Sequence, residues 1–233
     1  MESFMRTGYQ HLYDAREGFE ESDAVAQAPI HPKLKELYAA DAERKREIYN
    51  AWAMDYDQQI LAELGYVAAR EAVELFVRHF REYNGLILDA ACGTGLAGLE
   101  LSEFGFPYVE GMDLSLNMLE RSTKKVVYKR FIERDVNEPL GLDGRYHGIV
   151  CAGLFGYGDP GLHCLTHLVQ ALKPEGICVA TVNAMAWDEL GLENQLMELS
   201  AQGRFVVEKI KTQPYIRLGD IKSQTIVVKN KGS

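Results

Sequence analysis

A carboxylate followed by closely spaced glycines is the part of this sequence best suited to hold a ligand. Asp89 ends the apolar run Leu86-Ile87-Leu88, and the chain continues as Ala90-Ala91-Cys92-Gly93-Thr94-Gly95. Because glycine has no Cβ, a loop of this kind can bring bare backbone against a bound molecule. A carboxylate just before the loop favours a ligand that carries positive charge, such as an ammonium or a sulfonium group.

The same loop also matches a dinucleotide-binding pattern. Gly93, Gly95 and Gly98 form a literal G-x-G-x-x-G, and Asp113 follows at about the distance, roughly 20 residues, expected for an acid that binds a ribose. That interpretation predicts a nicotinamide-dependent oxidoreductase. A pyrophosphate is an anion that favours the amides of a helix N-terminus, and the carboxylate of Asp89 opposes it.

Short apolar runs alternate with helical stretches around this loop. Such an alternation predicts a parallel sheet with right-handed crossovers. The expected strands are 86–91, 108–113, 126–132, 146–152 and 176–183, with helices at 95–104, 115–124 and 160–172. After a further helix at 187–202, residues 204–210 and 223–229 alternate with only a loop between them, which predicts an antiparallel pair. The expected fold is therefore α/β, a Rossmann-like doubly wound sheet of seven strands that is mostly parallel and ends in a C-terminal antiparallel hairpin.

The N-terminal part of the chain has helical periodicity instead. Apolar residues recur at helical spacing from Pro32 to about Leu64, and a second amphipathic helix is expected from about Val67 to Tyr83. Residues 1–30 are weakly periodic and are interpreted as mobile or loosely docked helix. We therefore expect an N-terminal helical lid over residues 1–64 and a ligand-binding domain over residues 65–233.

Composition narrows the classes of partner. The chain has 233 residues and a net charge of −9, and its densest basic cluster, Lys124 to Arg130, is short and interrupted. Nucleic acid is disfavoured as a partner because cationic contacts supply most non-specific affinity for it. No run approaches the roughly 18 apolar residues of a membrane span, and no signal peptide is visible. With four widely spaced cysteines, these features predict a cytoplasmic protein with reduced thiols.

Four further stretches extend the pattern begun by Asp89. They are Gly111-Met112-Asp113-Leu114-Ser115, Arg134-Asp135-Val136, Tyr146 to Gly153, and the turn Leu172-Lys173-Pro174-Glu175-Gly176. In this order and spacing, the chain from about residue 85 to the C-terminus resembles class I S-adenosylmethionine-dependent methyltransferases. The segments Ile48 to Gln58 and Leu64 to Arg70 resemble the methyltransferase-like proteins of the Williams–Beuren region.

The resemblance implies an S-adenosyl-L-methionine site, with S-adenosyl-L-homocysteine as the product. The methionine part would lie against Asp89, Ala91, Cys92, Gly93, Thr94 and Gly95, and the transferable methyl would face Cys151, Ala152 and Gly153. Asp113 would hold the ribose hydroxyls, while Leu114, Met118, Asp135 and Val136 would surround the adenine. The family commonly has glycine where Ala91 stands, which is the one departure from its loop.

Several of these residues also have structural interpretations. Tyr49, Trp52 and Tyr56 share one helix face, so they either cover the cofactor or pack on the domain. Asp135 could instead be a turn residue, and Asp113 could simply precede a helix whose N-cap is Ser115. His163 and His167 share a helix face, but no third ligand with suitable spacing follows, so no metal site is expected.

The expected activity is transfer of a methyl group by direct displacement to a small-molecule acceptor, with a protein acceptor less favoured. The pocket candidates are Phe155, Tyr157 and Asn183, and no catalytic base is nominated. The chain lacks an Asn-Pro-Pro-Tyr after the fourth strand, the signature of enzymes that methylate nucleobase amines. The alternatives are the nicotinamide-dependent oxidoreductase and a non-catalytic cofactor-binding module. The oligomeric state is left open.

Overall fold

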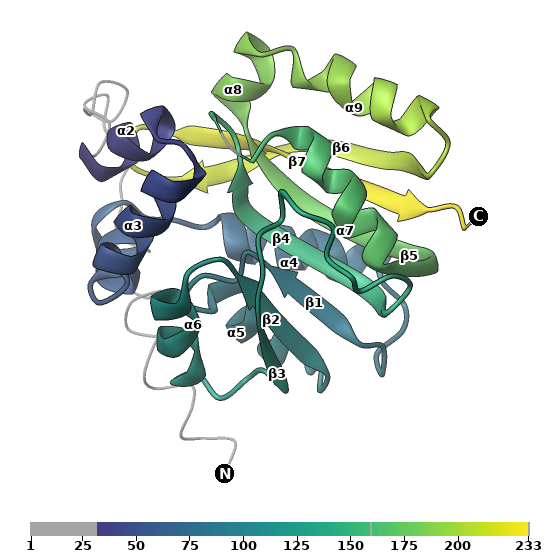
Figure 1. The fold of residues 1–233 in the computed structure, drawn as a ribbon, viewed down its shortest axis with the longest axis horizontal. Helices are drawn as coiled ribbons and strands as arrows, with labels where there is room; N and C mark the ends of the chain where they lie inside the picture. The colour runs from purple at the N-terminus through teal and green to yellow at the C-terminus, as the bar shows by residue number, and fades with distance from the viewer. Residues whose placement is uncertain (1–31, 159, 233) are drawn as a thin grey trace.

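The computed structural model describes residues 32–158 and 160–232. The expectation for residues 1–30 therefore lies outside the described residues. Seven strands form one sheet in the order β3-β2-β1-β4-β5-β7-β6 (Figure 1). Their bounds are β1 Ile87–Ala90, β2 Val109–Asp113, β3 Arg130–Glu133, β4 Tyr146–Phe155, β5 Leu172–Asn183, β6 Phe205–Ile216 and β7 Ile221–Asn230.

The five strands β1 to β5 run parallel, and β7 lies antiparallel between β5 and β6. This arrangement confirms the doubly wound, mostly parallel sheet with a C-terminal antiparallel hairpin. The strand order reverses between β1 and β4, where a parallel sheet of this type opens a crevice at its carboxyl edge.

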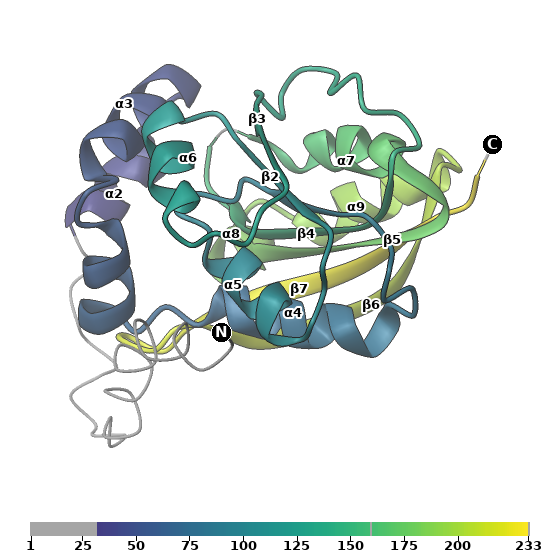
Figure 2. The same ribbon diagram turned by 90° about the horizontal axis from the view of Figure 1, so that it is seen from below.

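Helices cover both faces of the sheet (Figure 2). On one face lie α4 (Ala68–His79) and α5 (Leu96–Glu103), and on the other lie α7 (Leu165–Ala171), α8 (Ala184–Glu189) and α9 (Leu192–Ala201). Side chains of the central strands alternate between the two apolar clusters: Ile149 and Cys151 of β4 belong to one, and Val150 between them belongs to the other. The sheet is thus buried on both faces, as parallel strands require.

The N-terminal helical stretch is not one helix. It divides into α2 (Pro32–Ala39), α3 (Ala42–Trp52) and a wider π-helical segment, η2 (Gln58–Glu63). The first break follows from Asp41, whose side chain accepts a hydrogen bond from Arg44 N at 2.8 Å and so starts a new helix. Residues 53–55 form a turn that makes the second break. Helix α3 packs beside α6 (Leu116–Thr123), at the carboxyl edge of the sheet.

Other boundaries also differ from the expected ones. The turn expected before the fifth strand is a bulge within β5, where Glu175 adopts a φ of 68°. The third strand begins only at Arg130, because Val126 adopts a left-handed φ of 56°. Gly191, at a φ of 62°, divides the helix expected over 187–202 into α8 and α9. No helix among residues 32–158 and 160–232 is long and apolar enough to cross a membrane.

Tyr128 explains two of the three glycines in the G-x-G-x-x-G string. A Cβ on Gly98 would lie 2.3 Å from the Tyr128 hydroxyl oxygen, and one on Gly95 would lie 3.0 Å from the Tyr128 ring. Gly95 also caps α5 at a φ of 93°. The third glycine therefore makes room for a tyrosine of the same chain.

We expect Gly98→Ala to lower the free energy of unfolding by about 1–3 kcal/mol, because overpacking a closed contact displaces its neighbours. Urea denaturation measures this loss. In a Tyr128→Ala background the same substitution should be neutral or stabilising, since alanine favours a helix over glycine. An equal loss in both backgrounds would contradict the contact.

Candidate cofactor-binding site

Asp89 lies near the end of β1 and is buried, with 1% of its surface exposed. One carboxylate oxygen accepts a hydrogen bond from the Tyr128 hydroxyl at 2.6 Å. Burial raises the pKa of Asp89 to about 7, although the hydrogen bonds from Tyr128 and from the Gly98 backbone act in the opposite direction. No cationic side chain of residues 32–158 and 160–232 forms an ion pair with this carboxylate. Within this described part of the chain, burial of the Asp89 carboxylate is therefore not balanced by a cation.

The loop after β1 bends through left-handed backbone. Ala91 has a φ of 55° and Gly93 a φ of 53°. An L-residue other than glycine rarely adopts such a φ. This conformation explains why a glycine is common at the position of Ala91 in similar loops, and it shows that the alanine follows the same path.

Asp113 ends β2 and organises the next turn. Its two carboxylate oxygens accept hydrogen bonds from Gly93 N at 2.8 Å and from Ser115 N at 2.9 Å. Ser115 in turn caps α6 by accepting a hydrogen bond from Met118 N at 3.1 Å. Burial raises the pKa of Asp113 above its ordinary value, and the backbone amides lower it. Asp113 therefore serves the helix start and also lines a cavity.

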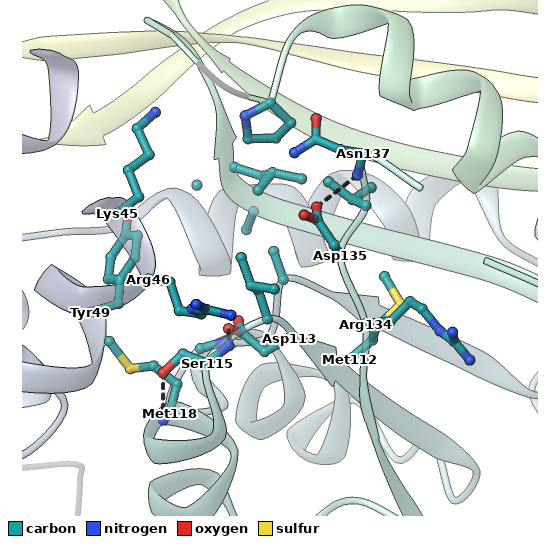
Figure 3. Close-up of a pocket in the computed structure, with 18 of the residues that line it drawn as sticks. Lys45, Arg46, Tyr49, Met112, Asp113, Ser115, Met118, Arg134, Asp135 and Asn137 are labelled. Carbon is teal, nitrogen blue, oxygen red and sulfur yellow. Dashed lines mark hydrogen bonds between the residues drawn. The ribbon is translucent and has the colours of Figure 1, made fainter. Parts of the chain in front are cut away.

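That cavity, called the outer cavity below, lies at the carboxyl edge of the sheet and measures about 900 Å³ when the space open to solvent is included. In Figure 3, Lys45 and Tyr49 of α3 face Asp135 and Asn137 across it, and Asp113 lies between them. Its lining includes these predicted residues: Tyr49, Tyr56, Ala91, Gly93, Asp113, Leu114, Met118, Asp135, Val136, Ala152 and Gly153. Residues that sequence reasoning missed also line it: Lys45, Arg46, Met112, Ser115, Arg134, Asn137, Leu154 and Pro160.

A second cavity, called the inner cavity below because it lies at the end of the central strand β1, adjoins the first and measures about 320 Å³ with the space open to solvent included. Asp89, Cys92 and Thr94 line it, together with Tyr66, which the sequence analysis did not nominate. The two cavities share the walls Tyr56, Ala91, Gly93 and Ala152. The inner cavity thus contains the Asp89 carboxylate and adjoins the larger outer cavity.

Tyrosine hydroxyls lie next to the end of β4. At Gly153, a Cβ would lie 2.9 Å from the Tyr66 hydroxyl oxygen and 3.5 Å from that of Tyr215. The two rings pack edge to face with centroids 5.5 Å apart. Burial raises the pKa of Tyr66 well above its ordinary value, so this phenol stays protonated at neutral pH.

Six of the predicted residues line neither cavity: Trp52, Gly95, Cys151, Phe155, Tyr157 and Asn183. Trp52 is buried, and its indole nitrogen donates to Gln59 Oε1 at 2.6 Å. Its ring packs edge to face on Tyr56 at 4.9 Å, so it supports a cavity wall from behind. Asn183 caps α8, and the Tyr157 hydroxyl donates to Glu189 Oε2 at 2.7 Å.

Asp135 and its neighbours are also held by local contacts. One Asp135 oxygen accepts a hydrogen bond from Asn137 N at 2.8 Å, so the turn that the sequence suggests is present beside the cavity. His167 Nδ1 lies 2.8 Å from Val136 O, and Cys164 Sγ lies 3.2 Å from Asn137 Oδ1. The helix that suggested a metal pair therefore supports the segment that follows β3.

The sequence of the chain is similar to those of known methyltransferases. Residues 87–176 match the model of a methyltransferase-domain family. The chain is 34% identical over 146 residues to human methyltransferase-like protein 27. The matched region makes up 60% of this chain and 59% of the relative. It is 31% identical over 144 residues to YqeM of Bacillus subtilis, a candidate methyltransferase, covering 59% and 56% of the two chains. The matches thus span less than two thirds of either curated relative.

The fold is also similar to that of solved methyltransferase structures. A solved candidate S-adenosyl-L-methionine-dependent methyltransferase from Methanococcus maripaludis superposes with a TM-score of 0.58 at 14% identity, over 81% of this chain and 94% of that one. At this identity the likeness concerns the fold alone. Residues 87–176 are therefore similar in sequence to a methyltransferase domain, and the sheet has the fold of a solved candidate S-adenosyl-L-methionine-dependent methyltransferase.

Proposed function

We propose that this protein binds S-adenosyl-L-methionine across the two cavities and transfers its methyl group to a small-molecule acceptor. The observation that carries the proposal is the buried carboxylate of Asp89 in the inner cavity, which forms an ion pair with no cation of residues 32–158 and 160–232. A buried charge is costly unless an opposite charge accompanies it. The ammonium of a methionine group would supply that charge, and the sulfonium would add a second positive charge nearby.

The outer cavity suits the adenosine part. Asp113 presents a half-buried carboxylate at the end of β2, where ribose hydroxyls would donate to it. Leu114, Met118 and Val136 offer apolar surface for a planar base, and Asp135 lies beside them for an exocyclic amine.

Direct displacement demands little acid–base chemistry from the protein. When bound, S-adenosyl-L-methionine supplies an activated methyl group, and S-adenosyl-L-homocysteine is the product. The protein contributes orientation, which is worth about 7–11 kcal/mol for well-placed reactants. In this proposal Gly153, Tyr66 and Tyr215 lie at the transfer end, and Leu154 and Pro160 line the way out to the acceptor.

The N-terminal helical segment acts as the lid in this proposal. Tyr49 and Tyr56 belong to it and line the outer cavity, and Lys45 Nζ donates to Tyr157 O at 3.0 Å from the opposite side. We keep residues 1–64 as the lid region and residues 65–233 as the cofactor-binding domain. A cytoplasmic location is part of the same proposal, supported by four free, buried cysteines.

The nicotinamide-dependent alternative has less support. The Asp89 carboxylate lies beside the loop that would hold a pyrophosphate, and Gly98 contacts Tyr128 rather than facing the cavity. Tight binding of S-adenosyl-L-homocysteine without transfer to any acceptor in a broad panel would instead indicate the non-catalytic module.

The raised pKa of Asp89 predicts a pH-dependent affinity. Above pH 7 the carboxylate is mostly ionised and pairs with the ligand ammonium, whereas below its pKa of about 7 binding must first release a proton. The affinity for S-adenosyl-L-homocysteine should therefore fall by up to about tenfold per pH unit below pH 7. Isothermal titration calorimetry at several pH values measures this slope.

Two controls isolate Asp89. The ligand 5′-methylthioadenosine keeps the ribose but lacks the ammonium, so its affinity should change little over the same range. In Asp89→Asn the slope for S-adenosyl-L-homocysteine should also disappear. A slope that survives this substitution would assign the proton to another group.

Asp113→Ala should weaken S-adenosyl-L-homocysteine binding by about 1–3 kcal/mol, because the ribose hydroxyls lose their acceptor in a partly buried site. Calorimetry measures the loss. Competition with adenosine and 2′,3′-dideoxyadenosine tests its origin: the wild-type protein should prefer adenosine, and the variant should not. An unchanged preference in the variant would remove Asp113 from the ribose site.

A further inference from the structure

Lys125 is a lysine in an unusual place. It follows α6 within the short basic cluster of the sequence, yet its side chain is only 1% exposed. Its ammonium donates to Asp57 Oδ2 at 2.7 Å and to Thr94 O at 2.6 Å. Burial lowers the pKa of Lys125, and the charge of Asp57 counteracts that effect.

These contacts join three distant segments of the chain. Asp57 belongs to the N-terminal helical segment, Thr94 to the glycine loop and Lys125 to the connection after α6. The triangle is closed because the Thr94 hydroxyl also donates to Asp57 Oδ1. A Cβ on Gly95 would lie 3.2 Å from Lys125 Cδ, so the loop packs tightly on the lysine stem as well.

Both ends of this cluster touch the cavities. Tyr56 immediately precedes Asp57 and forms part of the wall that the two cavities share. Thr94 lines the inner cavity beside Asp89. Other contacts, such as Ser115 Oγ to Asn50 Oδ1 at 2.6 Å, hold the helical segment on α6, whereas the Asp57–Lys125–Thr94 cluster holds it on the glycine loop.

We propose that Asp57 and Lys125 are positioning residues for methyl transfer, which fix Tyr56 and Thr94 in the geometry that receives the cofactor. This inference rests on the proposed function. A buried ion pair contributes little net stability, but removing one partner leaves an uncompensated charge, so the pair requires Asp57 and Lys125 to stay together. Keeping them together holds the helical segment on the glycine loop.

The test compares Lys125→Met, Asp57→Asn and the double variant with wild type. Each single variant leaves one polar partner of the cluster unsatisfied, so it loses stability for a reason unrelated to the ligand. The double variant removes both charges and should regain much of that stability. If the pair positions the site, the double variant should still bind S-adenosyl-L-homocysteine at least about tenfold more weakly than wild type.

Arg145→Met is the matched control. It replaces another long cation, whose Nη2 lies 2.5 Å from Glu110 Oε1 near the amino ends of β2 and β4. This variant should lose stability without a change in ligand affinity. Hydrogen exchange adds a second readout, because amides of residues 53–57 and 93–97 should exchange faster in the double variant and not in Arg145→Met.

The outcomes separate the two proposals. Wild-type affinity in a folded double variant would overturn the positioning role and leave the proposed function standing. Failure of the wild-type protein to bind S-adenosyl-L-homocysteine would overturn the proposed function, and the positioning role with it. If Arg145→Met weakened S-adenosyl-L-homocysteine binding as much as the double variant does, a general loss of stability would explain both results. That outcome would also overturn the positioning role.

Discussion

The structure depends on one constraint: a carboxylate is buried at the point where the sheet reverses its strand order. Asp89 lies near the carboxyl end of β1, between β2 on one side and β4 on the other. Burial there raises its pKa to about 7, so ionisation of Asp89 is unfavourable in the ligand-free protein and only about half complete at pH 7. A cationic ligand relieves that cost, which links the fold directly to the chemistry of the ligand.

The surrounding elements maintain this constraint. Tyr128 donates to the carboxylate while its ring packs over the glycines of the loop and of α5. The helical segment closes the other side, with Tyr56 between the two cavities and Trp52 packed behind it. Docking this segment through a buried lysine makes the shape of the site depend on residues that touch no ligand.

Much of this arrangement could be predicted from sequence because it follows local rules. Asp89, Asp113 and Asp135 each come at or just after a short apolar run, and the carboxyl ends of parallel strands meet at one edge. The antiparallel hairpin was equally visible, since two alternating runs are joined by a loop alone. Left-handed backbone at Ala91 agrees with the preference for glycine at that position.

Other features depend on contacts between distant residues and left no local signal. Lys125 looked like part of a solvated basic cluster, and its burial follows only from the approach of Asp57 and Thr94. Tyr128 lay in an expected strand, but the left-handed backbone at Val126 places it in the preceding loop. Trp52 shares a helix face with Tyr49, yet its ring is buried and packs on Tyr56, which follows the turn at residues 53–55.

The most direct test of the central claim is a crystal structure of the protein with S-adenosyl-L-homocysteine. The account predicts that the homocysteine ammonium lies within hydrogen-bond distance of Asp89 in the inner cavity, with the ribose on Asp113 in the outer one. A ligand bound with its ammonium away from Asp89, or with the inner cavity empty, would contradict it.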